Sequence, residues 1–146
     1  MNQRKLIHYF SHFLEGVIEE LKLNGNDMNI KLECKYLAES ITPGYEYFYC
    51  VLKKCSDLYF QFWDDEEVKI TELREIAFLK PEILNVEKDG DYIKLFVNCV
   101  NGHTGGNLYF KAKDIKVYDE DFSQISEEDM LEINDKYWQL HNKAEG

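Results

Sequence analysis

The sequence predicts an α+β fold with an N-terminal amphipathic helix, a mainly antiparallel sheet of about six strands, and a C-terminal helix. Apolar residues recur at helical spacing over long stretches near both ends of the chain, whereas the middle alternates apolar and polar residues, as half-buried strands do. The links between the expected strands are too short for parallel crossovers, so the sheet should be antiparallel. A length of 146 residues suits one domain, residues 1–146.

The first helix is expected over residues 3–23. Asn24-Gly25 should end it, because glycine adopts the left-handed C-cap conformation without a steric penalty. The apolar positions three and four residues apart that predict this helix are Leu6, Ile7, Phe10, Phe13, Leu14, Val17, Ile18 and Leu21.

Three strands are expected next. Residues 28–37 alternate, with Met28 and Leu32 on the buried face. After a loop at 38–44, residues 45–63 read as two strands around the turn "KKCSD", and eight of these nineteen residues are aromatic. Packing in the core explains this density best. An interface or pocket is the alternative, because Tyr and Trp are enriched at interfaces.

A charged turn at residues 64–67 leads into a segment with mixed signals. Residues 68–79 predict a short strand or turn, followed by one or two helical turns that end at Pro81. The helix should stop there because a residue before proline is pushed out of the helical region.

The segment 82–100 predicts a hairpin. Asp89-Gly90 should form its two-residue turn, because both central positions of a type I′ turn need positive φ. The resulting strand pairs, all expected on the buried face, are Val86 with Ile93 and Leu84 with Leu95.

The last strand, residues 107–118, contains a change of phase. Ile115 and Val117 are one residue out of step with Phe110, so a β-bulge near Lys113-Asp114 should absorb the slip.

The closing helix is expected over residues 126–143. Ser126 and Asp129 have the spacing of a capping box, and Ile125 with Met130 that of a hydrophobic staple. The expected buried stripe consists of Met130, Ile133, Tyr137 and Leu140.

The loop at residues 101–106, "NGHTGG", joins two expected strands. A phosphate-binding glycine loop normally leads into a helix, whose N-terminus supplies amide groups, and this loop does not. Positive φ in a hairpin connection is therefore the favoured explanation of the three glycines. The alternative is a small anion or ligand held by backbone amides together with His103 and Thr104.

Two further groups of residues could carry chemistry. His8 and His12 lie one helical turn apart with Glu15 nearby, and such a set can hold zinc, but the shared face is the polar, solvated side of the expected helix. Cys55 follows two lysines, which lower a thiol pKa, yet no histidine is close in sequence to act as a base. We therefore predict no metal, no cofactor and no catalytic residue.

The charge of the chain restricts its partners. The formal net charge is −11, and no cluster of Lys and Arg suits a nucleic-acid backbone, so direct nucleic-acid binding is not expected. Residues 114–146 hold ten acids and three bases, a local charge of −7. This acidic end favours a basic partner.

The sequence also indicates a compartment. It contains no apolar run long enough to cross a membrane, and its first residues lack the uninterrupted apolar core of a signal peptide. Four cysteines occur without a C-x-x-C motif, which suits free thiols. We expect a cytoplasmic protein without membrane contact.

These features predict a non-catalytic, acidic interaction protein that binds a basic protein partner, like immunity, inhibitor or anti-defence proteins in charge and size alone. The expected partner-binding residues are Glu128, Glu132, Asp135, Tyr59 and Trp63. The alternative is a small-ligand-binding domain whose aromatic pocket comes from residues 45–63, with His103 and Thr104 at its mouth.

Overall fold

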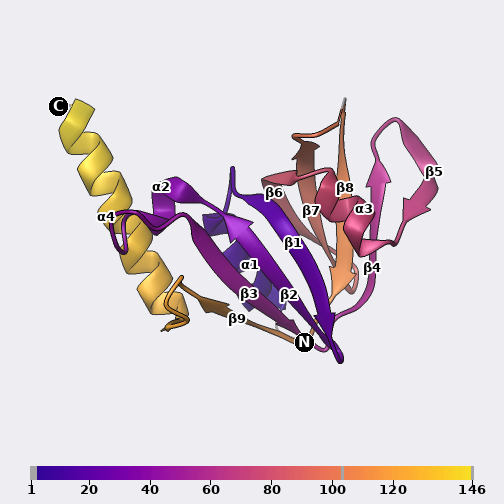
Figure 1. Ribbon diagram of the computed structural model, residues 1–146, viewed down its shortest axis with the longest axis horizontal. Coiled ribbons are helices and arrows are strands. Elements are labelled where there is room, and N and C mark those ends of the chain that lie inside the picture. Colours follow the sequence, from indigo (N-terminus) through magenta and orange to yellow (C-terminus); the bar gives the residue numbers. More distant parts are fainter. Residues whose placement is uncertain (1–2, 103, 146) are drawn as a thin grey trace.

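In the described part of the chain, the fold consists of one sheet of ten antiparallel strands with four helices (Figure 1), which confirms the α+β class but not the expected number of about six strands. The computed structural model describes residues 3–102 and 104–145, with side chains for residues 3–102 and 104–139. The strands are β1 (Val17–Asn24), β2 (Asp27–Glu33), β3 (Tyr47–Lys53), β4 (Ser56–Phe62), β5 (Asp65–Ile70), β6 (Pro81–Asp89), β7 (Tyr92–Cys99), β8 (Gly105–Lys111), β9 (Asp114–Tyr118) and β10 (Gln124–Ile125). The helices are α1 (Gln3–His12), α2 (Lys35–Ala38), α3 (Leu73–Phe78) and α4 (Glu127–Glu145).

The sheet curls back on itself. Its strand order is β10-β9-β3-β2-β1-β6-β7-β8-β4-β5, but β3 leads into β4 and β8 into β9 after only two residues. The partners Lys53–Asp114 and Ser56–Lys111 keep one pairing register across both breaks, and Lys113 donates to the Lys53 carbonyl at 2.8 Å. β3-β4 and β9-β8 therefore form one long, bent two-stranded ribbon. The remaining strands β2, β1, β6 and β7 connect the two arms of this ribbon, β3 and β8, so the sheet forms a closed curl.

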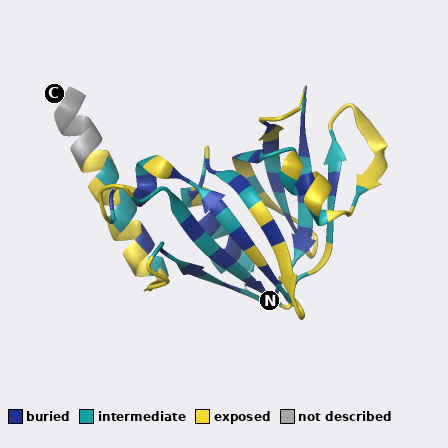
Figure 2. Cartoon of the chain, in the orientation of Figure 1, coloured by how far each residue is buried: buried dark blue, intermediate teal, exposed yellow. Residues whose placement is uncertain are grey.

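Helix α1 fills the concave side of this curled sheet. Phe10 and Phe13 are fully buried, with ring centroids 5.8 Å from Phe110 of β8 and 5.0 Å from Phe48 of β3. The inward positions of the strands around α1 are the buried, dark blue segments of Figure 2. In the resulting hydrophobic core, Phe10 of α1 contacts the β8 arm of the ribbon, and Phe13, just after α1, contacts the β3 arm.

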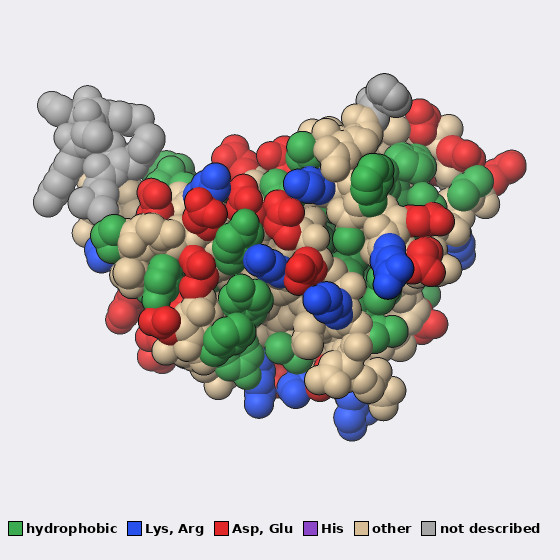
Figure 3. Space-filling view, in the orientation of Figure 1, with side chains coloured by type: hydrophobic (Ala, Val, Ile, Leu, Met, Phe, Trp, Pro, Cys, Tyr) green, Lys and Arg blue, Asp and Glu red, His purple; other side chains and the backbone are tan. Residues whose placement is uncertain are grey.

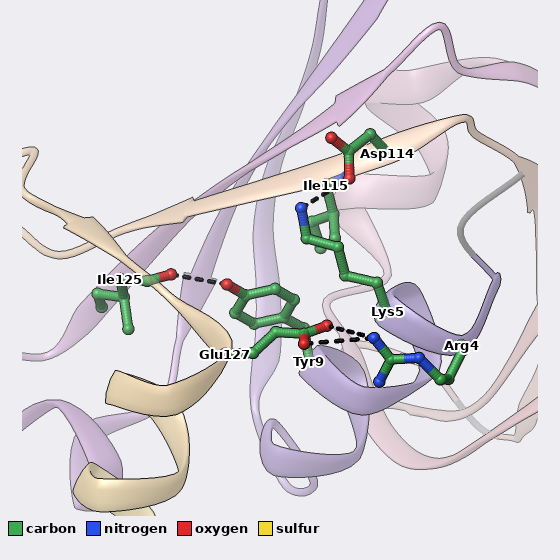
Figure 4. Close-up of polar contacts among 7 residues, drawn as sticks. All are labelled: Arg4, Lys5, Tyr9, Asp114, Ile115, Ile125 and Glu127. Carbon is green, nitrogen blue, oxygen red and sulfur yellow. Dashed lines mark hydrogen bonds and ion pairs between the residues drawn. The ribbon is translucent and has the colours of Figure 1, made fainter.

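Three polar contacts of α1 hold β9, β10 and the start of α4 in place (Figure 4). The Tyr9 hydroxyl donates to the Ile125 carbonyl at 2.7 Å, and Lys5 pairs with Asp114 at 2.8 Å. Arg4 pairs with Glu127 at 3.4 Å. Burial, followed by the nearby Glu127 carboxylate, raises the pKa of Tyr9 to about 12, so its hydroxyl remains a donor at neutral pH.

The expected helix over residues 3–23 is wrong beyond His12, because β1 replaces its second half. A bulge at Glu19 interrupts the β1–β2 pairing, so Ile18 and Leu21 both face the core although they are three residues apart. This spacing imitates a helix. The chain reverses at Glu15, whose φ is +71°, and Gly25, with φ +64°, closes the β1–β2 turn instead of a helix.

The expected register of the hairpin 82–100 is also wrong. Asp89 pairs with Tyr92, so the turn residues are Gly90 and Asp91, and Val86 lies opposite Leu95 instead of Ile93. Gly90 alone in this turn has positive φ, at +61°. A second bulge displaces Leu84, which is 44% exposed, and turns Ile83 into the core in its place.

The neighbouring expectations are partly confirmed. The strand expected over 28–37 ends at Glu33, because α2 begins at Lys35, and Met28 and Leu32 are buried. The two strands expected in 45–63 exist as β3 and β4, but they pair with other strands and not with each other. Residues 64–67 lie partly in β5, and α3 ends before Pro81 as expected.

The expectations for the last third of the chain hold best. The single bulged strand expected over 107–118 is instead two strands, β8 and β9, and the expected change of phase falls at the break between them, with Phe110 and Ile115 both buried. Ser126 and Asp129 form the capping box reciprocally, at 3.0 and 3.2 Å. Met130 of the expected stripe is fully buried, Ile133 and Tyr137 are half-buried, and the side chain of Leu140 lies outside the described residues.

Candidate functional site

An exposed tryptophan packs closely against a glycine at the β4–β8 end of the sheet. Trp63 follows β4 and is 45% exposed. Its backbone N–H donates to the Gly105 carbonyl at 3.1 Å, and its indole N–H donates to Asn107 Oδ1 at 2.9 Å. A Cβ on Gly105 would lie only 2.6 and 2.8 Å from two atoms of the indole ring. We call Trp63, Gly105 and Asn107 the Trp63 platform.

This arrangement explains the glycine pair and corrects the expected role of "NGHTGG". Neither Gly105 nor Gly106 has positive φ, and both are strand residues of β8. A Cβ on Gly106 would lie 2.3 Å from the Gln61 carbonyl and 2.5 Å from the Phe60 ring. Successive residues of a strand point to opposite faces. The pair therefore makes room for Trp63 outside the sheet and Phe60 inside it.

Beyond the Trp63 platform, the outer face of the sheet carries a tyrosine cluster, defined as Tyr59, Tyr92 and Tyr109. Tyr59 stacks on Tyr109 with centroids 4.7 Å apart, and both meet the Tyr92 ring edge-on at 5.8 and 6.0 Å. Asn107 Nδ2 donates to the Tyr109 hydroxyl at 3.4 Å. Asn107 therefore links the cluster to the indole of Trp63.

Lysines cover the rings of this cluster. Lys69 lies 4.6 Å from the Tyr59 centroid, and Lys111 lies 4.8 Å from that of Tyr92. Lys94 lies 4.7 Å from the Phe96 centroid and 5.8 Å from that of Tyr109. Such contacts stabilise an exposed site by about 0.5–1 kcal/mol each. No lysine or arginine within the described ranges lies over Trp63.

The structure divides the sequence-predicted residues between two places. Trp63 and Thr104 lie near each other at the β4–β8 end, because Thr104 immediately precedes Gly105 of the Trp63 platform, and Tyr59 lies on β4 within the tyrosine cluster. The acids Glu128, Glu132 and Asp135 lie on α4, which projects from the opposite end in Figure 1. His103 lies outside the described residues.

Helix α4 presents a second candidate surface. Glu128, Leu131, Asp135 and Trp138 lie on one side, because they are spaced three, four and three residues apart. Leu131 is 45% exposed and Trp138 is 50% exposed. We call these four residues the α4 outer face. The buried Met130 points the other way, toward the body of the protein.

A shallow hollow of about 390 Å³ lies on the outer face of β1, β2, β3 and β9. Its aromatic wall is Tyr49, Tyr118 and Phe122, and the Phe122 ring stacks on Tyr49 at 4.8 Å. Phe122 is 66% exposed with φ +60°, and two hydrogen bonds to Asp119 Oδ1 shape its loop. Sequence reasoning missed Phe122; the signal was "DEDFS", since Asp accepts hydrogen bonds from backbone N–H groups shortly after it.

The histidines are not on a solvated face. His8 and His12 are both half-buried, and their rings lie 4.9 Å apart. Burial, followed by the neighbouring His8, lowers the pKa of His12. Glu15 lies beyond the end of α1 and does not share their face. Across the ranges that the structure describes, no three His, Cys, Asp or Glu side chains are arranged to hold a metal ion.

The thiols are not activated either. Burial, followed by the charge of Asp57, raises the pKa of Cys55 to about 11, so the lysines before it do not produce a thiolate. Burial raises the pKa of Cys34 to about 11 and that of Cys50 to about 12. A nucleophilic cysteine needs the opposite shift.

Comparison of the chain with family models, curated proteins and solved structures found no match. Within the described residues, no helix combines the length and the apolar composition that crossing a bilayer requires.

Proposed function

We propose that this chain is a non-catalytic protein that binds a basic protein partner through the α4 outer face. The observation that carries the proposal is that face itself: two carboxylates alternate with two half-exposed apolar side chains on a helix that projects from the sheet. Interface anchors are typically large side chains such as Trp, flanked by groups that steer the partner.

The charges on α4 are available to a partner. Residues 119–135 contain eight acids and no base. Several of these acids already hold local structure, such as Asp129 in the helix cap and Glu127 in the pair with Arg4. Glu128, Glu132 and Asp135 are exposed and form no hydrogen bond or ion pair with another described residue.

The test compares two charge reversals of equal size. A pull-down from host lysate at low and high salt identifies the partner, and stopped-flow binding then measures the purified pair. Glu128→Lys, Glu132→Lys and Asp135→Lys together should slow association at least tenfold at low salt and flatten its salt dependence, while dissociation changes less. The matched control is Glu75→Lys, Asp89→Lys and Asp91→Lys, three exposed acids away from α4.

The two variants separate the possible outcomes. If both variants slow association equally, only the net charge of the protein affects the rate. If the folded α4 variant associates at the wild-type rate, α4 is not part of the contact. Trp138→Ala should raise the dissociation rate, since an apolar anchor acts after encounter. A dissociation rate unaffected by Trp138→Ala would contradict its role as an anchor.

A second candidate function, small-ligand binding, is favoured by the hollow beside Phe122. Residues 45–63 contribute Tyr49, Val51 and Lys53 to its lining. A thermal-shift screen of metabolites and nucleotides tests it, because a ligand at 100 times its Kd adds about 2.7 kcal/mol of stability. A hit that survives in Phe122→Ala would not bind in this hollow.

We also propose a reducing compartment, the cytoplasm, for this protein. All four cysteines are free thiols, and Cys34, Cys50 and Cys99 are buried. Free thiols without disulfide partners are typical of cytosolic proteins. Tagging the protein in its host and locating it by fractionation would test this; recovery from an oxidising compartment would contradict it.

A further inference from the structure

The Trp63 platform differs from the other rings on its face of the sheet. Tyr59, Tyr92 and Phe96 each have a lysine of this chain within 5 Å of the ring centroid. Tryptophan binds cations more strongly than tyrosine or phenylalanine does. Yet no lysine or arginine among the described residues lies over the Trp63 ring.

The Trp63 ring is held in a fixed orientation. Two ring atoms lie so close to Gly105 that even a Cβ would not fit there, and the indole N–H is bonded to Asn107. Asn107 is in turn bonded to Tyr109 of the tyrosine cluster. Trp63 is nevertheless 45% exposed, so part of its ring is accessible to a ligand. A ring fixed in this way loses little conformational entropy on binding.

Carboxylates adjoin the platform in the sequence. Asp64 follows Trp63 in the β4–β5 turn, and Asp65, Glu66 and Glu67 continue along β5. All four are exposed, and none forms an ion pair with a described residue. Figure 3 shows acidic side chains gathered at the end of the molecule that carries β5. This charge attracts a cation and repels a phosphate.

We propose that Trp63 binds an arginine side chain of the basic partner, with the guanidinium stacked on the indole and paired with carboxylates of the β4–β5 turn. Arginine fits better than lysine because its guanidinium is planar, weakly hydrated and able to form two parallel hydrogen bonds to a carboxylate. The inference rests on the proposed function only in taking the partner to be a basic protein.

The experiment uses a single-arginine probe and the full chain. Trp138→Phe leaves Trp63 as the one indole, since the sequence has two tryptophans. N-acetyl-arginine amide should shift the Trp63 indole N–H resonance in a saturable way, with a dissociation constant on the order of 10 mM. N-acetyl-citrulline amide, the neutral analogue at matched ionic strength, should shift it at least fivefold less. Equal shifts with both probes, or none with arginine, would overturn the proposal.

Two variants test the carboxylates and the ring separately. Asp64→Asn with Asp65→Asn should weaken arginine binding at least threefold, whereas Asp89→Asn with Asp91→Asn, on the β6–β7 turn, should change it less than twofold. Trp63→Leu should abolish the arginine-dependent shifts of the backbone amides at 64–67 while the melting curve shows a folded protein. Unweakened binding in either the Asp64/Asp65 variant or Trp63→Leu would overturn the site.

The α4 charge reversal distinguishes this inference from the proposed function. It should leave the arginine response of Trp63 unchanged, because α4 lies at the opposite end of the molecule (Figure 1). Normal partner association in that variant, with a normal arginine response, would sustain the Trp63 site and contradict the α4 contact. Slowed partner association in that variant, together with no arginine response of Trp63 in the wild type, would support the α4 contact and contradict the Trp63 site.

Discussion

The two long terminal segments of the chain both form helices, but the sheet encloses one and leaves the other largely outside. Phe10 of α1 and Phe13, which directly follows α1, pack among rings from β3 and β8, and all of these rings are fully buried. Helix α4 buries Met130 near its start and exposes Leu131 and Trp138 further on. The difference is one of burial: the α1 segment completes the core, whereas α4 exposes apolar and acidic side chains at the surface.

The two helices are nevertheless joined at one point. The Tyr9–Ile125 and Arg4–Glu127 contacts tie α1 to the residues where α4 begins. The capping box at Ser126 then fixes the first turn of α4. A projecting helix with a fixed base presents its outer face in a defined direction, and such preorganisation reduces the entropy that a binding event at that face would cost.

The largest expected effect on stability comes from truncating one aromatic side chain at each end of the chain, because this compares how much the α1 and α4 segments contribute to the core. Phe13→Ala should cost roughly 3–5 kcal/mol of unfolding free energy, because it opens a cavity between α1 and Phe48. Trp138→Ala should cost less than about 1 kcal/mol, because that side chain is half-exposed on α4. Urea unfolding of both variants gives the two values. Similar losses would mean that α4 is as much a part of the core as α1.

A smaller effect should come from the contact that joins the helices. Tyr9→Phe removes one hydroxyl and leaves the buried Ile125 carbonyl without its donor, at a cost of roughly 1–2 kcal/mol. Hydrogen exchange should also become faster in the first turns of α4 than in β2. Uniform acceleration across the chain would instead show that α4 opens only with global unfolding.

The sequence predicted α4 better than α1 for a physical reason. The capping box, the staple and the apolar stripe of α4 are local signals, and each is complete within a few residues. The end of α1 depends on Glu15 with its positive φ and on a bulge at Glu19 that only the pairing with β2 creates. A bulged strand with Ile18 and Leu21 inside has the same apolar spacing as one helical turn.

The Trp63 platform could be predicted only in part. Its aromatic character was visible in residues 45–63, and Trp63 was among the expected partner-binding residues. The role of Gly105 could not be predicted, because it depends on the ring of Trp63, 42 positions earlier in the sequence, packing against this residue. The expected explanation, positive φ, is local and correct for Gly90, whereas the clearance of an aromatic ring is a tertiary property.

The smallest expected effect concerns His12, which lies between the two helices. Its pKa is lowered from the ordinary value of 6.5 first by burial and then by His8, while Asn134 and Asp135 of α4 act in the opposite direction. Below pH 6.5 the unfolded chain binds a proton that folded His12 resists. Stability linked to His12 is therefore complete above that pH and is lost as the pH falls through the folded pKa.

His12→Gln should remove this dependence. The decisive quantity is the difference in unfolding free energy between wild type and variant, measured by urea unfolding from pH 7.5 to 5, because protonation of the many carboxylates affects both proteins alike. That difference should shift in favour of the variant as the pH falls. A constant difference would show that Asp135 and Asn134 offset the burial of His12, and that the junction of α1 with α4 is more polar than the contacts of α1 with the sheet.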